Sequence, residues 1–589
     1  MVHTWAVRTS LLSDDPCDYS CFAASHAIIV LIDFLSLAPR AEAKAILTLL
    51  QKFDSEDPKA DDQLFFSQQL LLYLKGDLDI RISIDSNCDL FQPLSRVKQD
   101  TWSLLANPHR FRNELTGSEP VILHGNGPSK TTLLGLSNYI AGAYSNFYGT
   151  MSHVQVPEKD IDLYPLAVGL FFIGTPFEGD FIESIDALQI DKSKTKLYVY
   201  YGANSRVKIP EEIHQQYTSY HVLGDDEECR ARASFLEKAN RDGVKFALLV
   251  DSDIIINVDT VAKDLAAWNQ TIVTGHAQRE KLLWSNFWTD ASSSGWYQRG
   301  FDTIKLLDHT RTGLFQVPFV RGLLLVRADM LTTMADLHKA NSGSKDICPV
   351  KVSHDALNSG VALFADNRQL YATMLGSEEF AKPDAPFPEL YEAKMSPSLW
   401  AKHYLVADYQ NQQVQEPCQD AYGVVLFTKR FCDELVATTE AKNHWSSGGH
   451  EDARLGSGYE NYPTQDIHMN QFEFEDEWIH IMKEYIRPYI LREYDGVTIK
   501  GEINLAFVVR YSMDGQRELV PHNDNSLVTS TVQLNSNFTG GGVEFTRYNC
   551  STVSKAPGYV LLHPGRVTHN HKAHPITSGT RYVLVSFNK

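Results

Sequence analysis

Hydrophobic residues in the last third of the chain fall into short runs that are separated by Gly, Pro and Asn. The clearest runs are Ile503–Tyr511, Val543–Phe545 and Tyr559–Leu562, and glycines stand directly before the last two. β-Branched and aromatic residues favour strands, and the breaks between them favour turns. Residues 415–589 are therefore predicted to form two packed antiparallel sheets. This arrangement is the double-stranded β-helix, or jelly roll.

Residues 160–400 show a different pattern, in which apolar strands alternate with stretches of helical periodicity. The strands are expected at Leu166–Ile173, Leu197–Tyr201 and Phe246–Val250. This alternation predicts a Rossmann-type α/β domain with a mainly parallel sheet. The proline-rich segment Gly376–Pro397 is predicted to connect it to the third domain, and Trp400 just beyond is a candidate to pack on a neighbour.

Two carboxylates, Asp251 and Asp253, directly follow the predicted strand Phe246–Val250. Open α/β sheets bind ligands at this end of their strands, so one interpretation is a site for a metal and a UDP-sugar. The other interpretation is that the two aspartates cap loops and helices. Because short motifs produce many false matches, the structural interpretation is preferred.

Length and composition set the limits for these domains. A chain of 589 residues is too long for one hydrophobic core and implies two to four domains. The apolar content of 43% and charged content of 22% are ordinary for a globular protein. The net charge of −19, with no basic stripe to offset it, argues against a nucleic-acid partner.

The eight cysteines are too few for a disulfide scaffold of this length. The candidate pairs in an oxidising compartment are Cys17 with Cys21 and Cys418 with Cys432. No cysteine spacing is that of a zinc site. Glycosylation sequons, which matter only on the secretory route, begin at Asn269, Asn537 and Asn549.

The first residues do not predict a secretory signal. Met1–Ser20 lacks an apolar stretch and a small-residue cleavage site. Cys21–Leu37 is apolar, but polar residues interrupt it and it is short for a membrane span. We therefore expect Cys21–Leu37 to belong to a hydrophobic core.

The strongest chemical signal is His522-Asn523-Asp524, which is followed by several histidines. A His-x-Asp pair and one distant His are the ligands of the facial triad, which leaves positions on Fe(II) for O₂ and a co-substrate. In an extended segment His522 and Asp524 point the same way, because side-chain direction repeats every second residue. The third ligand must come from another strand, and spacing alone does not choose among the candidates His563, His569, His571 and His574. The histidines that are not ligands are expected to be satisfied by hydrogen bonds.

Arg581 opens a run in which every second residue shares one face. The members of that face are Arg581, Val583, Val585 and Phe587. An arginine at the end of an inward apolar face needs a planar anionic partner, and a carboxylate of 2-oxoglutarate would supply one through a bidentate pair. The triad and this arginine together indicate an iron dioxygenase.

Residues 415–589 also contain a series of longer motifs in a specific order. They are Trp445-Ser446, His450–Leu455, Gly458–Met469, Phe507–Tyr511, Gly540–Gly542, Arg547–Cys550, His563–His569 and Gly579–Tyr582. This series resembles the procollagen-lysine 2-oxoglutarate 5-dioxygenases, the lysyl hydroxylases. The resemblance favours His571 as the third ligand beside His522 and Asp524, and implies that Arg581 and Tyr511 hold 2-oxoglutarate.

One position departs from the family pattern. The family usually has an Asn in the run after the His-x-Asp, and this Asn also helps to hold the co-substrate. Here the position is Thr531. A hydroxyl can replace only part of the role of an amide, so binding of the co-substrate is expected to differ.

The resemblance implies hydroxylation of lysine at C5 in X-Lys-Gly sequences of procollagen, giving 5-hydroxylysine, succinate and CO₂. It implies Fe(II), 2-oxoglutarate and L-ascorbate as cofactors, a homodimer, and a place in the endoplasmic reticulum lumen with peripheral association with its membrane. The substrate ammonium needs a carboxylate or a polar clamp. The acidic stretch Glu473–Glu477 is one candidate, although acidic runs are usually solvated faces.

Residues 1–150 resemble the later part of the family's glycosyltransferase domain. The matches are Asp61–Phe66, Ile84-Asp85, Phe91-Gln92 and His124–Lys130. In relatives an Asp-x-Asp and the His that corresponds to His124 hold a metal. No Asp-x-Asp precedes Asp61, and the first nucleotide-binding strands have no counterpart, so we expect an incomplete, N-terminally truncated domain without transferase activity. Residues 160–400, through Leu283–Trp288, resemble the family's central accessory domain, which is also glycosyltransferase-like.

Three hypotheses follow for the whole chain. The first is an Fe(II)- and 2-oxoglutarate-dependent lysyl hydroxylase with a truncated transferase domain. The second is a UDP-sugar glycosyltransferase acting on collagen hydroxylysine, against which the missing Asp-x-Asp weighs. The third is a collagen-binding pseudoenzyme in which Thr531 prevents turnover.

Overall fold

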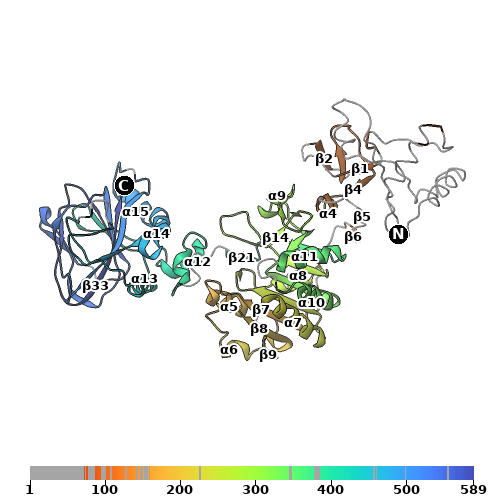
Figure 1. Ribbon diagram of the computed structural model, residues 1–589, viewed down its shortest axis with the longest axis horizontal. Helices are drawn as coiled ribbons and strands as arrows, with labels where there is room; N and C mark the ends of the chain where they lie inside the picture. Colours follow the sequence, from red (N-terminus) through yellow and green to blue (C-terminus); the bar gives the residue numbers. More distant parts are fainter. Residues whose placement is uncertain are drawn as a thin grey trace.

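The computed structural model describes residues 161–589, except 225–226, 344–347, 377–384, 455–457, 459, 498 and 554–555. Between residues 72 and 160 it describes separate parts, of which 109–125 is the longest. The expectations for Cys17 and Cys21, for Cys21–Leu37, for Asp61–Phe66 and for Ile84-Asp85 lie outside the described residues. The chain has a multi-domain α/β architecture, with the C-terminal sheets at one end (Figure 1).

The first described elements are short strands and one helix. They are β1 (Phe91–Pro93), β2 (Trp102–Ala106), β3 (His109–Asn113), β4 (Ile122–His124) and α4 (Lys130–Ser137). β1 and β4 are parallel, and β2 and β3 are antiparallel. Helix α4 packs on the central region, because Leu134 is fully buried in the same cluster as Phe171 and Phe235.

The central region is built around an eight-stranded sheet in the described residues, in the order β17-β20-β12-β19-β10-β7-β8-β9. Its strands are β7 (Leu166–Phe172), β8 (Thr195–Tyr201), β9 (Ser219–Val222), β10 (Phe246–Asp251), β12 (Ile272–Gly275), β17 (Leu314–Gln316), β19 (Leu323–Arg327) and β20 (Leu363–Asp366). The three strands expected in this region are therefore confirmed. The sheet is parallel from β10 to β9, but β19 is antiparallel to both its neighbours and β17 to β20. β12 and β20 are parallel to each other, so six of the eight strands run in the same direction and only β17 and β19 are reversed. The sheet is mixed, and the prediction of a mainly parallel sheet is confirmed.

Helices cover both faces of this sheet. They are α5 (Glu178–Asp186), α7 (Glu228–Arg241), α8 (Val261–Ala266), α10 (Leu331–Ala340) and α11 (Cys348–Asn358). Alternate residues of β7 enter different clusters: Val168 packs with Phe181 of α5, and Phe171 packs with Phe235 of α7. Gly169 is required by this packing, since a Cβ there would lie 2.8 Å from the Phe235 ring. Burial on both faces explains why β7 is apolar throughout.

The connection between the central and C-terminal regions is packed on both. Its helix α12 (Pro397–Tyr404) lies between the two regions (Figure 1). Trp400 is fully buried and stacks on Tyr485 with ring centroids 5.6 Å apart, which confirms that it packs on a neighbour. On the other side, Lys402 and His403 both contact Asp180 of α5 at 2.7 Å. These contacts tie α12 to both regions.

The C-terminal region contains two antiparallel sheets in its described residues. The larger follows the order β22-β23-β31-β27-β33-β25-β24 with β28 beside β33, and the smaller is β26-β32-β29-β30. The strands are β22 (Gln415–Cys418), β23 (Ala421–Val425), β24 (Asp466–His468), β25 (Ile503–Ser512), β26 (Leu519–His522), β27 (Val528–Gln533), β28 (Phe538–Gly540), β29 (Val543–Phe545), β30 (Cys550–Thr552), β31 (Tyr559–Pro564), β32 (His571–Ala573) and β33 (Ile576–Asn588). The strands expected at Ile503–Tyr511, Val543–Phe545 and Tyr559–Leu562 are confirmed.

The larger sheet has one face under helices and one face toward a pocket. The helices are α13 (Lys429–Lys442), α14 (Glu475–Ile481) and α15 (Arg487–Glu493). On β25, Val508 packs in one cluster with Trp478 of α14, whereas Phe507 and Val509 pack in another. The alternation of side chains along each strand thus separates the helix-covered core from the pocket wall.

Disulfides tie distant elements together. Cys229 of α7 is bonded to Cys348 of α11, and Cys418 at the end of β22 is bonded to Cys550 of β30. Cys432 is a free, buried thiol on α13, so the predicted pairing of Cys418 with Cys432 is wrong. The chain instead brings Cys418 to the edge of the smaller sheet. Within the part of the chain that the structure describes, no helix is long and apolar enough to cross a bilayer.

A pH-dependent stability is expected from two buried carboxyl groups, Glu392 in the connection and Glu477 on α14 beside it. Burial raises the pKa of Glu392 to about 8 and that of Glu477 to about 7. A raised carboxyl pKa means that the folded protein binds more protons than the unfolded chain, so stability falls as the pH rises from the unfolded pKa toward 8. Glu392→Gln should remove part of this fall, on the order of 2–4 kcal/mol at pH 8.5 relative to pH 5.

The measurement is urea-induced unfolding at both pH values. The matched control is Glu475→Gln, on the exposed side of α14, which should behave as the wild type. An equal pH dependence in the wild type and Glu392→Gln would show that Glu392 does not ionise on unfolding as described.

Candidate metal and co-substrate site

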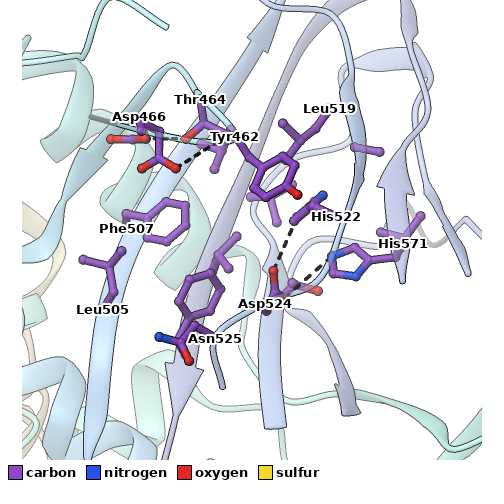
Figure 2. A pocket seen from close by; sticks show the side chains of 18 of the residues that line it. Tyr462, Thr464, Asp466, Leu505, Phe507, Leu519, His522, Asp524, Asn525 and His571 are labelled. Carbon is purple, nitrogen blue, oxygen red and sulfur yellow. Dashed lines mark hydrogen bonds and ion pairs between the residues drawn. The ribbon is translucent and has the colours of Figure 1, made fainter. Parts of the chain in front are cut away.

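Two histidines and one aspartate meet between adjacent strands of the smaller sheet. β26 and β32 are antiparallel, and His522 lies directly opposite His571. Nε2 of His522 is 3.4 Å from Oδ1 of Asp524, and Nε2 of His571 is 3.7 Å from Oδ2. The three ligand atoms lie within 4.8 Å of one another (Figure 2). The structure therefore brings together the three residues that the family resemblance favoured.

Asp524 reaches this position from a loop and not from a strand. β26 ends at His522, so the two-residue repeat of an extended segment does not place Asp524. Its backbone N–H donates to the carbonyl of Gly565 at 3.0 Å. Its Oδ2 accepts a hydrogen bond from the Thr529 hydroxyl at 2.6 Å. These contacts fix the carboxylate against the two imidazoles.

Both imidazoles are oriented by backbone carbonyls. Nδ1 of His522 donates to Val520 O and Nδ1 of His571 donates to His569 O, each at 2.9 Å. A proton held on Nδ1 leaves the lone pair of Nε2 facing Asp524. Metal-binding histidines are commonly oriented by an outer partner of this kind.

The charges at the site match those that a cation requires. Burial would raise the pKa of Asp524, but the adjacent imidazoles and the hydrogen bond from Thr529 lower it well below its usual range. Burial lowers the pKa of His571, which keeps that imidazole neutral. Burial would also lower the pKa of His522, but the Asp524 carboxylate raises it, as it would attract any cation at this position. An ionised carboxylate with a neutral imidazole is the protonation state in which these groups bind metals.

The other three histidines make different contacts. Nδ1 of His563 donates to Pro564 O at 3.0 Å, and burial lowers the pKa of His563 to about 3. His569 contacts Gln419 O and the Thr568 hydroxyl, both at 2.9 Å. His574 contacts Glu544 and Ser551 at 3.2 Å. These contacts confirm that the remaining histidines are satisfied by hydrogen bonds.

Arg581 carries a buried charge near the triad. It lies opposite Tyr511 in the pairing of β33 with β25, and only 6% of it is exposed. Its Nε donates to Gln533 at 3.1 Å, and burial lowers its pKa. Among the described residues, no carboxylate lies within ion-pair distance of its guanidinium. A buried charge without a counterion is costly, so the site favours an anion beside Arg581.

A cavity of about 290 Å³ joins these groups. The larger sheet contributes Tyr511, Thr531 and Arg581 to its wall, and the smaller sheet contributes His522 and His571. Asp524 lines it from the loop after β26. Every predicted site residue of the third domain thus lies in one pocket between the two sheets.

Comparison with known proteins identifies the family. The chain is 32% identical over 581 residues to procollagen-lysine,2-oxoglutarate 5-dioxygenase 1 of Gallus gallus, with 94% of this chain and 78% of that protein covered. It is 31% identical to procollagen-lysine,2-oxoglutarate 5-dioxygenase 2 of Homo sapiens, with 92% and 75% covered. The chain belongs to the procollagen-lysine 2-oxoglutarate 5-dioxygenase family. It is therefore an enzyme of this class.

Other members of this dioxygenase family carry a second activity in their names. The chain is 31% identical to the multifunctional procollagen lysine hydroxylase and glycosyltransferase of Caenorhabditis elegans, with 91% of this chain and 77% of that protein covered. The sequence model of the PLOD GT domain matches residues 40–150, and that of the glycosyltransferase family 25 N-terminal domain matches residues 195–378. The central region is thus glycosyltransferase-like.

The aspartates at the end of β10 are paired with arginines in this family member. Asp251 contacts Arg232 at 2.6 Å, and Asp253 forms an ion pair with Arg321. Both carboxylates are thus held in ion pairs with arginines, which is a structural role other than the predicted capping of loops and helices. His124 ends β4 and is half-buried, and burial lowers its pKa.

Sequence reasoning missed the acidic residues of the pocket. Glu460 and Asp466 line the cavity, whereas Glu473–Glu477 does not. Glu477 of that stretch faces the connection, where it accepts the backbone N–H of Lys394 at 3.1 Å. The assignment of Glu473–Glu477 to the pocket is therefore wrong. The Gly458–Met469 motif of the dioxygenase family contained both missed residues.

Proposed function

We propose that this chain hydroxylates lysine at C5 in X-Lys-Gly sequences of procollagen. The reaction consumes one O₂ and one 2-oxoglutarate for each lysine and gives 5-hydroxylysine, succinate and CO₂. The observation that carries the proposal is the convergence of His522, Asp524 and His571 beside the buried Arg581 in one pocket. The names of the relatives supply the substrate.

We further propose the finer architecture that this function requires. Residues 415–589 form a double-stranded β-helix, which is supported by two antiparallel sheets that line opposite walls of the pocket. The two preceding regions are glycosyltransferase-like. The matches of glycosyltransferase models to residues 40–150 and 195–378 support this division.

The residues of the triad fit Fe(II). Two imidazoles and one carboxylate, with donor atoms within 4.8 Å of one another, form the ligand set typical of non-haem iron oxygenases. When bound, Fe(II) supplies the activation of O₂ that lets an unactivated C–H bond be oxidised. His522, Asp524 and His571 would hold the ion, and Val520, His569 and Thr529 keep them in place.

The residues on the larger sheet fit 2-oxoglutarate. Arg581 offers a planar fork that suits a carboxylate better than a point charge would. Tyr511, its neighbour across the strands, is buried, and Thr531 faces the same cavity. L-Ascorbate is the expected reductant that would keep the iron in the ferrous state. The apolar wall around these groups limits the access of water to the reacting atoms.

The proposal is tested with the full chain, Fe(II), ascorbate, 2-oxoglutarate and an X-Lys-Gly peptide. Gain of one oxygen on lysine with an equal amount of succinate is the expected result. Sugar transfer from a UDP donor without hydroxylation would support a glycosyltransferase instead. Peptide binding without either product would support a collagen-binding pseudoenzyme.

A substitution at Thr531 tests the co-substrate site. Thr531→Asn restores the amide that relatives have at this position, so binding of 2-oxoglutarate should tighten by about two- to tenfold, the value of one added hydrogen bond. The dependence of succinate formation on 2-oxoglutarate concentration measures this. The dependence of succinate formation on peptide concentration should not become weaker in Thr531→Asn. Looser binding of 2-oxoglutarate would contradict the placement of residue 531 in the co-substrate site.

We also propose that the chain works in the endoplasmic reticulum lumen. The disulfides Cys229–Cys348 and Cys418–Cys550 require an oxidising compartment to form and persist. The sequon residues Asn269, Asn537 and Asn549 are all exposed, as glycosylation on that route requires. Procollagen, the proposed substrate, would meet the enzyme there.

A further inference from the structure

The substrate of the proposed reaction imposes a second requirement on the pocket. This inference rests on the proposed function, because it concerns how that site selects lysine. A lysine side chain is an apolar chain with a positive charge at its end. A pocket that selects it needs an apolar wall and a carboxylate whose charge is not already neutralised.

Two carboxylates besides Asp524 line the described part of the pocket, namely Glu460 and Asp466. Asp466 opens β24, the edge strand of the larger sheet, and only 6% of it is exposed. Figure 2 shows Asp466 on the side of the pocket opposite His522, Asp524 and His571. A lysine side chain with its C5 beside the triad would therefore extend its terminal ammonium group toward Asp466.

The charge of Asp466 is only partly balanced. Arg454 lies 2.7 Å from Oδ1 of Asp466, but it also binds both oxygens of Asp452 through its Nε and a terminal nitrogen. Burial lowers the pKa of His468, the other neighbour of Asp466, so this imidazole is neutral. Two carboxylates thus share one guanidinium, and the cluster keeps one surplus negative charge beside the pocket.

An apolar wall extends from Asp466 toward the interior. Asp466 of β24 pairs with Val509 of β25, which pairs with Val583 of β33. In the next inward-facing row, His468 pairs with Phe507, which pairs with Val585. All these residues line the pocket. Arg581 lies on β33, two strands from β24, which is about 10 Å across the sheet. An anion at Arg581 and a cation at Asp466 would therefore occupy separate ends of the cavity.

We propose that Asp466 binds the ammonium group of the substrate lysine and thereby determines the specificity of the pocket for lysine. Its surplus charge supplies the counterion, and the valines and phenylalanines of β25 and β33 contact the methylene chain. Glu460 is less suited, because it is half-exposed and its charge acts on His522. The carboxylate for the ammonium group thus comes from β24 and not from Glu473–Glu477.

The test compares an X-Lys-Gly peptide with the same peptide carrying norleucine, which is lysine without its amino group. Calorimetry gives both dissociation constants for the full chain with Fe(II) and 2-oxoglutarate under nitrogen, so that no turnover accompanies binding. A charge-assisted hydrogen bond to the ammonium should make the wild type prefer lysine by about 10- to 100-fold.

Asp466→Asn should bring the ratio of the two constants close to one, whereas the matched variant Glu460→Gln should leave it unchanged. Asp452→Asn should also lower the ratio, because Arg454 then pairs with Asp466 alone. If Asp466→Asn no longer binds 2-oxoglutarate and so has lost its fold, Asp452→Asn provides the test of the role of Asp466. If both Asp466→Asn and Asp452→Asn keep the preference for lysine, the inference is overturned. It is also overturned if only Glu460→Gln loses that preference.

The two proposals fail in different ways. If the wild type hydroxylates lysine but Asp466→Asn keeps the preference, only the role of Asp466 is overturned. If the wild type prefers lysine through Asp466 but forms neither hydroxylysine nor succinate, the ammonium site stands and the proposed hydroxylation is overturned.

Discussion

His571→Ala and Asp524→Ala are each expected to abolish succinate formation and lysine hydroxylation. Each removes one of three groups whose donor atoms lie within 4.8 Å of one another. Loss of an outer partner of a metal ligand typically costs roughly 10- to 100-fold, so loss of a ligand itself should exceed ~1000-fold. The measurement is the initial rate of succinate formation with saturating Fe(II), 2-oxoglutarate and X-Lys-Gly peptide.

The matched control for His571→Ala is His574→Ala. His574 lies three residues further along the chain, contacts Glu544 and Ser551, and does not line the pocket. This variant should keep the wild-type rate. Full activity in His571→Ala, or equal loss in both histidine variants, would show that the pairing of β26 with β32 does not create the metal site.

Arg581→Lys raises the concentration of 2-oxoglutarate needed for half-maximal rate by about 10- to 100-fold, the cost of replacing a bidentate pair to a carboxylate with one weaker contact. The buried site holds no carboxylate of its own for this cation among the described residues, and we propose the co-substrate as its counterion. The rate at saturating 2-oxoglutarate should fall less than the affinity does. Succinate formation is measured over a range of co-substrate concentrations.

The same substitution on an exposed arginine provides the control. Arg517 is exposed and donates to the Met513 carbonyl, away from the pocket wall. Arg517→Lys should leave the 2-oxoglutarate dependence unchanged. If Arg581→Lys also leaves it unchanged, the anion site lies elsewhere in the cavity.

The strands of both large sheets could be predicted because their signals are local. Ile503–Tyr511 alternates between the core under α14 and the pocket wall, so its composition alone indicates a strand. Strand β7 is buried on both faces and is therefore apolar throughout. In each case the residues that carry the pattern are neighbours in the sequence, and the side-chain repeat decides the structure.

The third ligand and the ammonium site could not be derived in this way, because they depend on strand pairing over long separations. His571 becomes a candidate ligand only when β32 pairs with β26, and spacing left four histidines open until the family resemblance was used. Asp466 lines the pocket only because β24 pairs with β25 at the edge of the sheet. The partner of Cys418 was mispredicted for the same reason, since β22 and β30 are brought together by the fold.

The proposed chemistry requires that His522, Asp524 and His571 bind a single ferrous ion beside Arg581. Equilibrium dialysis against Fe(II) under nitrogen, with and without 2-oxoglutarate, measures the number of ions bound by the full chain. We predict one ion per chain in the wild type, tighter in the presence of 2-oxoglutarate, and none in a chain with all three residues changed to alanine. Undiminished iron binding in that variant, or iron binding by the wild type that 2-oxoglutarate does not affect, would contradict this prediction.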